Sequence, residues 1–137
     1  MTVIRQEDLI ESVADALQYI SYYHPLDYIK SLADAYRREE SAAARDAIAQ
    51  ILPNSRMCAE GKRPICQDTG TPIFYVHYPE GTSIRRLREQ IKAALAEATK
   101  RSYMRPNAVD AIYDKNTGNN LGGDDFTSIH FEEVDAD

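Results

Sequence analysis

The chain has 137 residues, of which 43% are hydrophobic and 28% charged, and this composition is typical of a globular domain rather than of a disordered segment. Its formal net charge of −6 disfavours nucleic acids and anionic membrane surfaces as partners, because both select basic protein faces. No apolar run reaches the length of a membrane span, and the polar N-terminus does not resemble a signal peptide, so we expect a cytoplasmic protein.

Helices are predicted for the first part of the chain. Residues 2–21 carry apolar side chains three and four positions apart, with acidic residues between them, which predicts an amphipathic helix ended by His24-Pro25. Its expected buried stripe consists of Ile10, Val13, Leu17 and Ile20. Two further helices are predicted over residues 26–39 and 41–52, and Pro53 is expected to end the second of them. A short helix over residues 55–60 follows, with Asn54 as its cap and Gly61 at its end.

The second part of the chain mixes strands with one long helix. Residues 72–78 are rich in aromatic and β-branched side chains and predict a strand. A helix is predicted over residues 83–102, and residues 110–125 are expected to be loop. The stripe of that helix expected to be buried is Ile84, Leu87, Ile91, Leu95 and Ala98. Residues 126–134 alternate as a final strand does, with strand 72–78 as its expected neighbour. The predicted fold class is α+β, with a helical region over 1–52 and an α/β region over 53–137.

Residues 62–70 form the most distinctive stretch, with the sequence KRPICQDTG. An amide and a carboxylate are costly to bury without partners, so this is not core sequence. Pro64 favours an extended residue before it, and Gly70 permits a left-handed backbone after it. We therefore expect a held loop that presents Cys66, Gln67 and Asp68 in succession. A thiolate is a soft metal ligand, and a carboxylate beside it can accept or donate a proton.

This loop resembles the signature of the class I fumarate hydratase family of iron-sulfur hydro-lyases, which also includes the L-tartrate dehydratase alpha subunits. Three further stretches are similar to the same family and occur in the same order: MCAEG at 57–61, RPNAV at 105–109 and NTGNN at 116–120. The resemblance covers about the last two thirds of the chain. It implies an enzyme that interconverts fumarate and malate, a step of the tricarboxylic acid cycle, or that dehydrates tartrate or a related 2-hydroxy dicarboxylate.

The resemblance also implies roles for individual residues. Cys66 would be one of three thiolates that hold a [4Fe-4S] cluster, whereas a small buried side chain is the alternative interpretation of this cysteine. Gln67 and Asp68 would line the dicarboxylate pocket, with Asp68 placed for acid–base catalysis; alternatively Asp68 only stabilises its own turn. Arg105, held extended by Pro106, would bind a substrate carboxylate, with Lys62 and Arg63 adding positive charge. Cys58, on a predicted helix, is expected to be structural.

The chain departs from the family in one respect. Family members are longer and supply two more cluster cysteines downstream, whereas no cysteine follows Cys66 here. We therefore interpret residues 1–137 as the first part of an N-terminal cluster-binding domain, completed by the rest of the enzyme or by a second subunit. A homo-oligomer such as a dimer is expected for the complete enzyme, and the chain alone is expected to be inactive. The other interpretation is a cluster-less module that binds a dicarboxylate or a partner subunit.

Overall fold

The computed structural model describes residues 4–110, 112–121 and 127–135, and it confirms the predicted α+β class. The expected helix residue Thr2 and the expected strand residue Phe126 lie outside the described residues. In chain order, the elements within the described ranges are α1 (Gln6–Tyr22), α2 (Leu26–Arg38), α3 (Ala42–Gly61), β1 (Ile73–Pro79), α4 (Ile84–Lys100), β2 (Val109–Asp110), β3 (Lys115–Asn116) and β4 (Ser128–Val134). None of the helices among these residues is long and apolar enough to cross a membrane.

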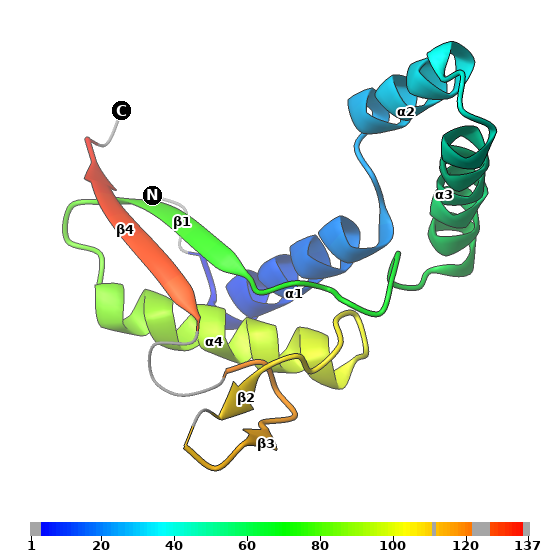
Figure 1. Ribbon diagram of the computed structural model, residues 1–137. Helices are drawn as coiled ribbons and strands as arrows, with labels where there is room; N and C mark the ends of the chain where they lie inside the picture. Colours follow the sequence, from blue (N-terminus) through cyan, green and yellow to red (C-terminus); the bar gives the residue numbers. More distant parts are fainter. Residues whose placement is uncertain (1–3, 111, 122–126, 136–137) are drawn as a thin grey trace.

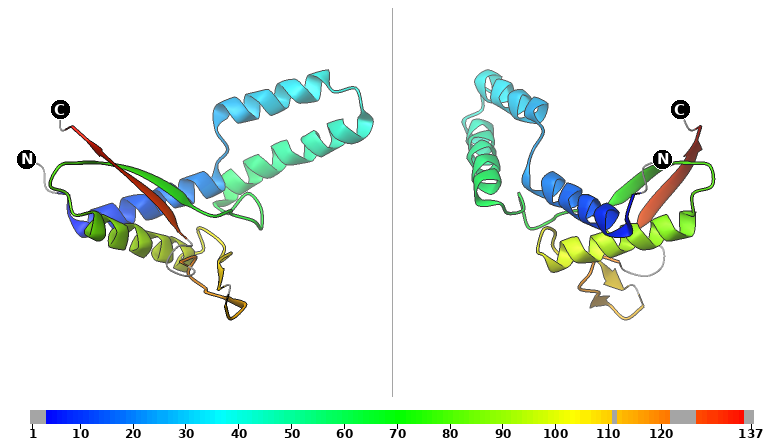
Figure 2. Two further views of the ribbon diagram at one scale, coloured as in Figure 1. Left: turned by 60° about the vertical axis from the view of Figure 1, so that its left-hand side comes forward. Right: turned by 180° about the vertical axis from the view of Figure 1, so that it is seen from behind.

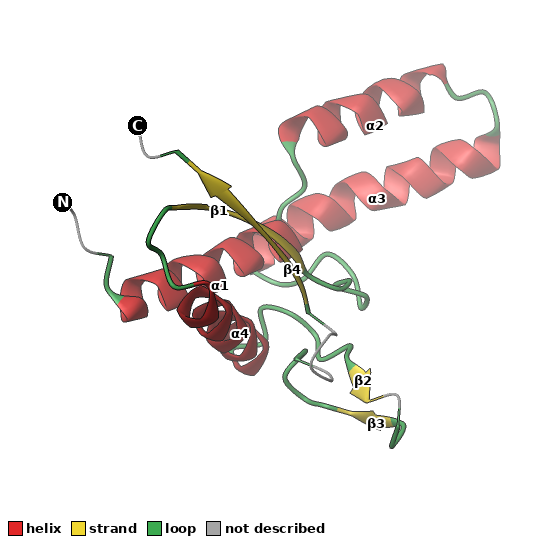
Figure 3. Ribbon diagram, turned by 90° about the vertical axis from the view of Figure 1, so that its left-hand side faces the viewer, coloured by secondary structure: helices red, strands yellow, loops and turns green. Residues whose placement is uncertain are grey.

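The elements form two groups (Figure 1). Helices α1 and α4 pack against each other, and the strands β1 and β4 lie beside them (Figure 3). Helices α2 and α3 lie side by side and project away from this group (Figure 2). No residue of α2 is buried, so this pair contributes little to the core. The connection that returns from α3 to β1 carries the 62–70 loop, which therefore lies where the two groups meet.

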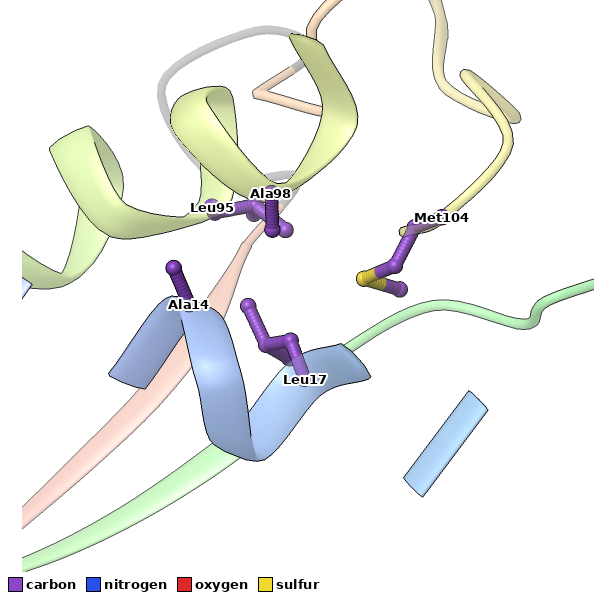
Figure 4. Packing of buried hydrophobic residues seen from close by; sticks show 5 residues of the cluster. All are labelled: Ala14, Leu17, Leu95, Ala98 and Met104. Atoms are coloured by element: carbon purple, nitrogen blue, oxygen red, sulfur yellow. The ribbon is translucent and has the colours of Figure 1, made fainter. Parts of the chain in front are cut away.

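The core lies between α1 and α4. Ala14 and Leu17 of α1 face Leu95 and Ala98 of α4, and Met104 closes one end of the cluster (Figure 4). Burial of these side chains supplies the hydrophobic stabilisation of this layer. The predicted burial of Leu17, Ile91, Leu95 and Ala98 is confirmed. It is wrong for Ile20, which is 65% exposed at the border of a hollow beside the 62–70 loop, and for Ile84, which is the first residue of α4 and is 38% exposed.

The strands β1 and β4 pair in parallel, from Ile73 opposite Ser128 to Pro79 opposite Val134. A parallel pair needs a long crossover, and α4 lies within the connection between the two strands. The expected pairing of these two segments is confirmed. Along β1, the side chains of Phe74, Val76 and Tyr78 are half-buried or buried, whereas those between them are exposed. The strand therefore covers the helix layer with one face only.

Two expectations about chain breaks are wrong. Pro53 does not end a helix, because α3 continues through it to Gly61. One proline removes one backbone donor, while the second half of α3 is held by other contacts: Ser55 Oγ lies 3.0 Å from His24 Nδ1, and Asn54, which is no cap, donates to the carbonyl of Ile65 at 2.9 Å. The expected end of the helical stretch at Gly61 is confirmed, since α3 ends there, and Lys62, with φ 47°, takes the left-handed position after the helix.

The prediction that residues 110–125 form a loop is also wrong in part. Val109 and Asp110 pair in antiparallel fashion with Asn116 and Lys115 in a small hairpin. The turn between these strands is stabilised by Asp110, whose Oδ1 accepts hydrogen bonds from the backbone N–H groups of Ile112 and Tyr113 at 2.9 Å each. A carboxylate that satisfies its own turn in this way is common in tight loops. The hairpin lies against residues 105–108, since Asn116 Nδ2 donates to the carbonyl of Pro106 and the backbone N–H of Thr117 donates to the carbonyl of Ala108.

Candidate active site

The 62–70 loop is fixed at Ile65. The backbone N–H of Ile65 donates to the carbonyl of Ser21 near the end of α1 at 3.0 Å, and its carbonyl accepts from Asn54 Nδ2 of α3 at 2.9 Å. The backbone N–H of Arg63 donates to the carbonyl of Cys58 at 3.1 Å. The loop is thus hydrogen-bonded to two helices immediately before Cys66, which restricts where the next three side chains can lie.

Cys66, Gln67 and Asp68 are all exposed, as expected for a presented loop. The thiol of Cys66 donates to the carbonyl of Asp68 at 2.9 Å. Asp68 Oδ1 accepts from the backbone N–H of Gly70 at 2.9 Å, and Gly70 takes the left-handed φ of 72° that this turn requires. Asp68 therefore does stabilise its own turn, while its carboxylate stays accessible to solvent.

A second segment, residues 105–107, comes to this loop from far along the chain. The backbone N–H of Arg105 donates to Thr69 Oγ1 at 3.1 Å. Asn107 Nδ2 lies 3.3 Å from Thr69 Oγ1 and 3.4 Å from Asp68 Oδ1, so one amide bridges two loop residues. The structure thus brings the expected site residues Asp68 and Arg105 into neighbouring segments, although 36 residues separate Thr69 from Arg105 in the sequence.

Two hollows flank the loop. The first has a volume of about 290 Å³ and is lined by Ile20, Ser21, His24, Ile65, Cys66, Asp68 and Thr69. The second, of about 550 Å³, lies among the basic residues Lys62, Arg63, Arg101 and Arg105, together with Tyr22 and Met104. Cys66 and Asp68 therefore share one hollow, and Arg105 lines the other. Gln67 lines neither of these two hollows.

The second hollow is locally cationic in an acidic chain. Arg101 is neutralised, because its guanidinium binds both carboxylate oxygens of Glu11 at 2.7 and 2.8 Å and also binds Glu97. These hydrogen bonds, which Arg101 donates to Glu11 first and Glu97 second, raise the pKa of Arg101 above its usual value. Lys62, Arg63 and Arg105 line the same hollow and supply its remaining basic groups. Such local charge suits an anionic ligand despite the net charge of −6.

The two cysteines differ in their surroundings. Cys58 is 4% exposed, and its Sγ lies 3.6 Å from Asn54 Oδ1 and 3.8 Å from the carbonyl of Ile65. This is the environment of a structural cysteine that supports the loop from beneath. Cys66 is exposed on the loop itself. Within the part of the chain that the structure describes, no three His, Cys, Asp or Glu side chains converge as a metal site would require.

Sequence reasoning missed Thr69, Asn107 and Asn120 as site residues. Thr69 and Asn107 join the loop to residues 105–107, and Asn120 makes three hydrogen bonds to residues 105–108 and one to Thr99. Asn107 and Asn120 both lie in stretches that resemble the family, and an amide that follows proline or glycine closely is a weak signal for such a bridge. Their burial could not be predicted, because it depends on contacts between segments far apart in the sequence.

Comparisons with known proteins agree with this geometry. Residues 10–137 match the model of the fumarate hydratase (Fumerase) family. The chain is 36% identical over 132 residues to a putative fumarate hydratase class I of Geobacillus stearothermophilus, which covers 96% of this chain and 26% of that protein. It is 30% identical over 125 residues to a putative L(+)-tartrate dehydratase subunit alpha of Methanocaldococcus jannaschii, covering 88% of this chain and 44% of that protein.

A third relative is the L(+)-tartrate dehydratase subunit alpha of Escherichia coli strain K12, which is 31% identical over 115 residues, covering 83% of this chain and 38% of that protein. The chain thus spans between about a quarter and less than half of the length of these relatives. The family match includes the 62–70 loop, residues 105–109 and residues 116–120, which the structure brings together. This chain belongs to the fumarate hydratase (Fumerase) family.

Proposed function

We propose that this chain supplies one part of the active site of a hydro-lyase that reversibly hydrates fumarate to malate. The observation that carries the proposal is the meeting of the 62–70 loop with residues 105–107, through the hydrogen bonds of Thr69 with Arg105 and Asn107. This meeting places a thiol, a carboxylate and a guanidinium in adjoining segments. It gives a dicarboxylate an electrostatic partner on one side and an acid–base group on the other.

The exposed thiol of Cys66 fits the role of a ligand to a [4Fe-4S] cluster. Its hydrogen bond to the carbonyl of Asp68 is made by the protonated thiol, so a Cys66 thiolate that held iron would not make this bond. Cys58 is buried and held between Asn54 and Ile65, which does not fit a second ligand. In this proposal the other ligands would come from residues outside this chain. When bound, such a cluster supplies a Lewis acid for the hydroxyl group of the substrate.

The chain's own residues bind the substrate and move a proton. The planar guanidinium of Arg105 binds a substrate carboxylate through two parallel hydrogen bonds, and Lys62 and Arg63 attract the dianion to the same hollow. The amide of Gln67 is exposed on the loop and lines neither hollow, so a hydrogen bond from it to the substrate would come from the loop surface. Hydration adds a hydroxyl group to one carbon and a proton to its neighbour. Either Asp68 or a residue outside this chain exchanges that proton, and the exposed carboxylate of Asp68 is free to move it to and from water.

A second candidate substrate is tartrate, because two of the similar proteins are named as L(+)-tartrate dehydratase alpha subunits. Both substrates are small dicarboxylates and would make the same contacts with Arg105. The word subunit in those names also supports a complete enzyme in which the rest of the protein, or a second subunit, joins this chain. We place this enzyme in the cytoplasm and expect it to assemble as a homo-oligomer such as a dimer.

The decisive experiment compares the two cysteines in the complete enzyme, meaning this chain together with the remaining sequence or subunit. Cys66→Ser should abolish cluster retention and the hydration of fumarate, whereas Cys58→Ser should leave both nearly intact. Iron and sulfide analysis measures cluster retention. Turnover of fumarate and of L-tartrate, measured separately, distinguishes the two substrates. Equal cluster loss in both variants would contradict the assignment of Cys66. Dicarboxylate binding without any iron would favour the cluster-less module.

The pocket is tested by Arg105→Lys, which keeps the charge and loses the forked geometry. Binding of a dicarboxylate to the anaerobic complete enzyme should weaken by about 1.5–3 kcal/mol, the range of a hydrogen bond to a charged group. Calorimetry measures this directly. Arg85→Lys, a change at an exposed residue of α4 that pairs with Glu89, is the matched control and should leave the affinity unchanged. An unchanged affinity in Arg105→Lys would remove Arg105 from the site.

A further inference from the structure

Asn120 is the most buried polar side chain near the candidate site. It is 1% exposed, and it is one of two large side chains that are fully buried among the described residues. Its backbone is left-handed, with φ 60°, a conformation that asparagine tolerates better than most residues. An amide in this position is strongly destabilising unless all of its hydrogen-bonding groups have partners.

The amide of Asn120 uses its full hydrogen-bonding capacity. Its Oδ1 accepts from the backbone N–H groups of Asn107 at 2.7 Å and Ala108 at 3.2 Å. Its Nδ2 donates to the carbonyl of Arg105 at 2.7 Å and to Thr99 Oγ1 at 3.0 Å. The orientation of the amide is unambiguous, because two partners are backbone donors and a third is a carbonyl that can only accept.

These four bonds join residues 105–108 to α4. Thr99 is 6% exposed, and its hydroxyl donates in turn to the carbonyl of Leu95 at 2.8 Å, so Asn120 is joined to the C-terminal part of α4. Three of the four bonds go to the backbone of Arg105, Asn107 and Ala108. The side chain of Arg105 is exposed, and the bond from Asn120 goes to the Arg105 backbone carbonyl instead. What Asn120 fixes is therefore the backbone from which the guanidinium extends.

We propose that Asn120 is a positioning residue, which holds residues 105–108 against α4 and thereby positions Arg105 for binding the dicarboxylate. This rests on the proposed function, since it assigns Asn120 a part in the same site. Binding energy from a guanidinium fork depends on its geometry, and a shift of about 1 Å in a positioning element can cost roughly a hundredfold in function. No contact between Asn120 and the ligand is needed.

The test uses succinate, a dicarboxylate without the double bond or hydroxyl group that react, bound to the anaerobic complete enzyme and measured by calorimetry. Asn120→Asp keeps the shape and the acceptor but replaces the donor that faces the carbonyl of Arg105 with a second acceptor. We expect succinate binding to weaken roughly ten- to hundredfold. Asn119→Asp is the matched control, because Asn119 Oδ1 only accepts from the backbone N–H of Leu121, which an aspartate also allows.

A double-mutant cycle separates positioning from general damage. In an Arg105→Ala background, Asn120→Asp should have little further effect on succinate binding, because Asn120 acts through Arg105. If the loss is as large there as in the wild type, the positioning role is wrong. If Asn120→Asp does not fold, Thr99→Val removes one of the four bonds with little change of shape, and it should weaken binding in the same direction.

The outcomes separate this inference from the proposed function. A wild-type enzyme that binds succinate, together with Asn120→Asp and Thr99→Val variants that bind it equally well, would overturn the positioning role alone. A wild-type enzyme that binds no dicarboxylate would overturn both. Three results together would establish that Asn120 fixes the position of Arg105. They are weakened binding in Asn120→Asp, unchanged binding in Asn119→Asp, and loss of the effect in the Arg105→Ala background.

Discussion

Cys66 and Cys58 lie eight positions apart in two different environments. Cys58 points beneath the loop and is 4% exposed, whereas Cys66 is presented on the surface of the loop. The sequence predicted this difference correctly, because a cysteine on a helix next to apolar residues differs in pattern from one between a proline and a glycine. It could not predict what holds the loop, since that depends on Ser21, Asn54 and Asn107.

The first prediction concerns the accessibility of these two thiols. In the reduced chain without iron, iodoacetamide should modify Cys66 under native conditions, while Cys58 should react only after local or global opening. Each ~1.4 kcal/mol of opening free energy slows the reaction of Cys58 tenfold. Mass spectrometry of digested peptides over time measures both rates in one sample. Equal rates would show that Cys58 is not buried, and in urea the two rates should converge.

The helices were the most predictable elements, because periodic apolar residues reflect burial on one side. The errors lie where contacts between segments override a local signal. Pro53 is a helix breaker by propensity, yet α3 continues, because Ser55 and Asn54 are held by His24 and Ile65. The hairpin of β2 and β3 has two residues in each strand, too few for any alternation to be recognised.

The second prediction tests the packing of α4 on α1. Leu95 is 0% exposed and faces Ala14 and Leu17, so Leu95→Ala should reduce the free energy of unfolding by about 2–5 kcal/mol. Leu26→Ala is the matched control, because Leu26 is 78% exposed, and it should change the stability by less than about 0.5 kcal/mol. Urea unfolding followed by circular dichroism measures both. A small effect at Leu95 would mean that the two helices do not pack as described.

The third prediction concerns the ion pair that joins α1 to the end of α4. The hydrogen bonds from Arg101 lower the pKa of Glu11, so the contribution of Glu11 to stability is present above its unfolded pKa and is lost as pH falls through the folded one. Glu11→Gln should therefore lower the melting temperature slightly at pH 7, and the difference from wild type should shrink below about pH 4.3.

The control for this pair is Asp15→Asn, a change of the same kind at an exposed position of the same helix. Its melting temperature should follow that of the wild type at both pH values. Because Glu11 and Arg101 are partly exposed, salt should also reduce the effect of Glu11→Gln. A difference between Glu11→Gln and wild type that stays constant from pH 7 to pH 3 would contradict the assigned pair.

At the scale of the whole molecule, the chain carries residues for two parts of the proposed site, one that binds the dicarboxylate and one that holds the cluster. The loop with Cys66 and Asp68 and the segment with Arg105 meet within this chain, so the residues proposed to bind the substrate are already held near one another. For the proposed cluster, this chain offers one exposed cysteine, because Cys58 and Cys66 are the two cysteines of the sequence and Cys58 is buried. The relatives to which it is similar are more than twice as long as the matched part.

The last prediction follows from this division. Residues 1–137 alone should assemble no stable [4Fe-4S] cluster and should show no hydratase activity, because a single accessible thiolate cannot hold a cluster for which the family resemblance implies three. Anaerobic reconstitution with iron and sulfide, read by absorbance and by fumarate consumption, tests this, with Cys66→Ser as the control for loosely bound iron. Addition of the remaining sequence or subunit should restore both signals in the wild type and not in Cys66→Ser. Turnover by the chain alone, with a stoichiometric cluster, would show that the additional ligands are not needed and that the assigned division of the site is wrong.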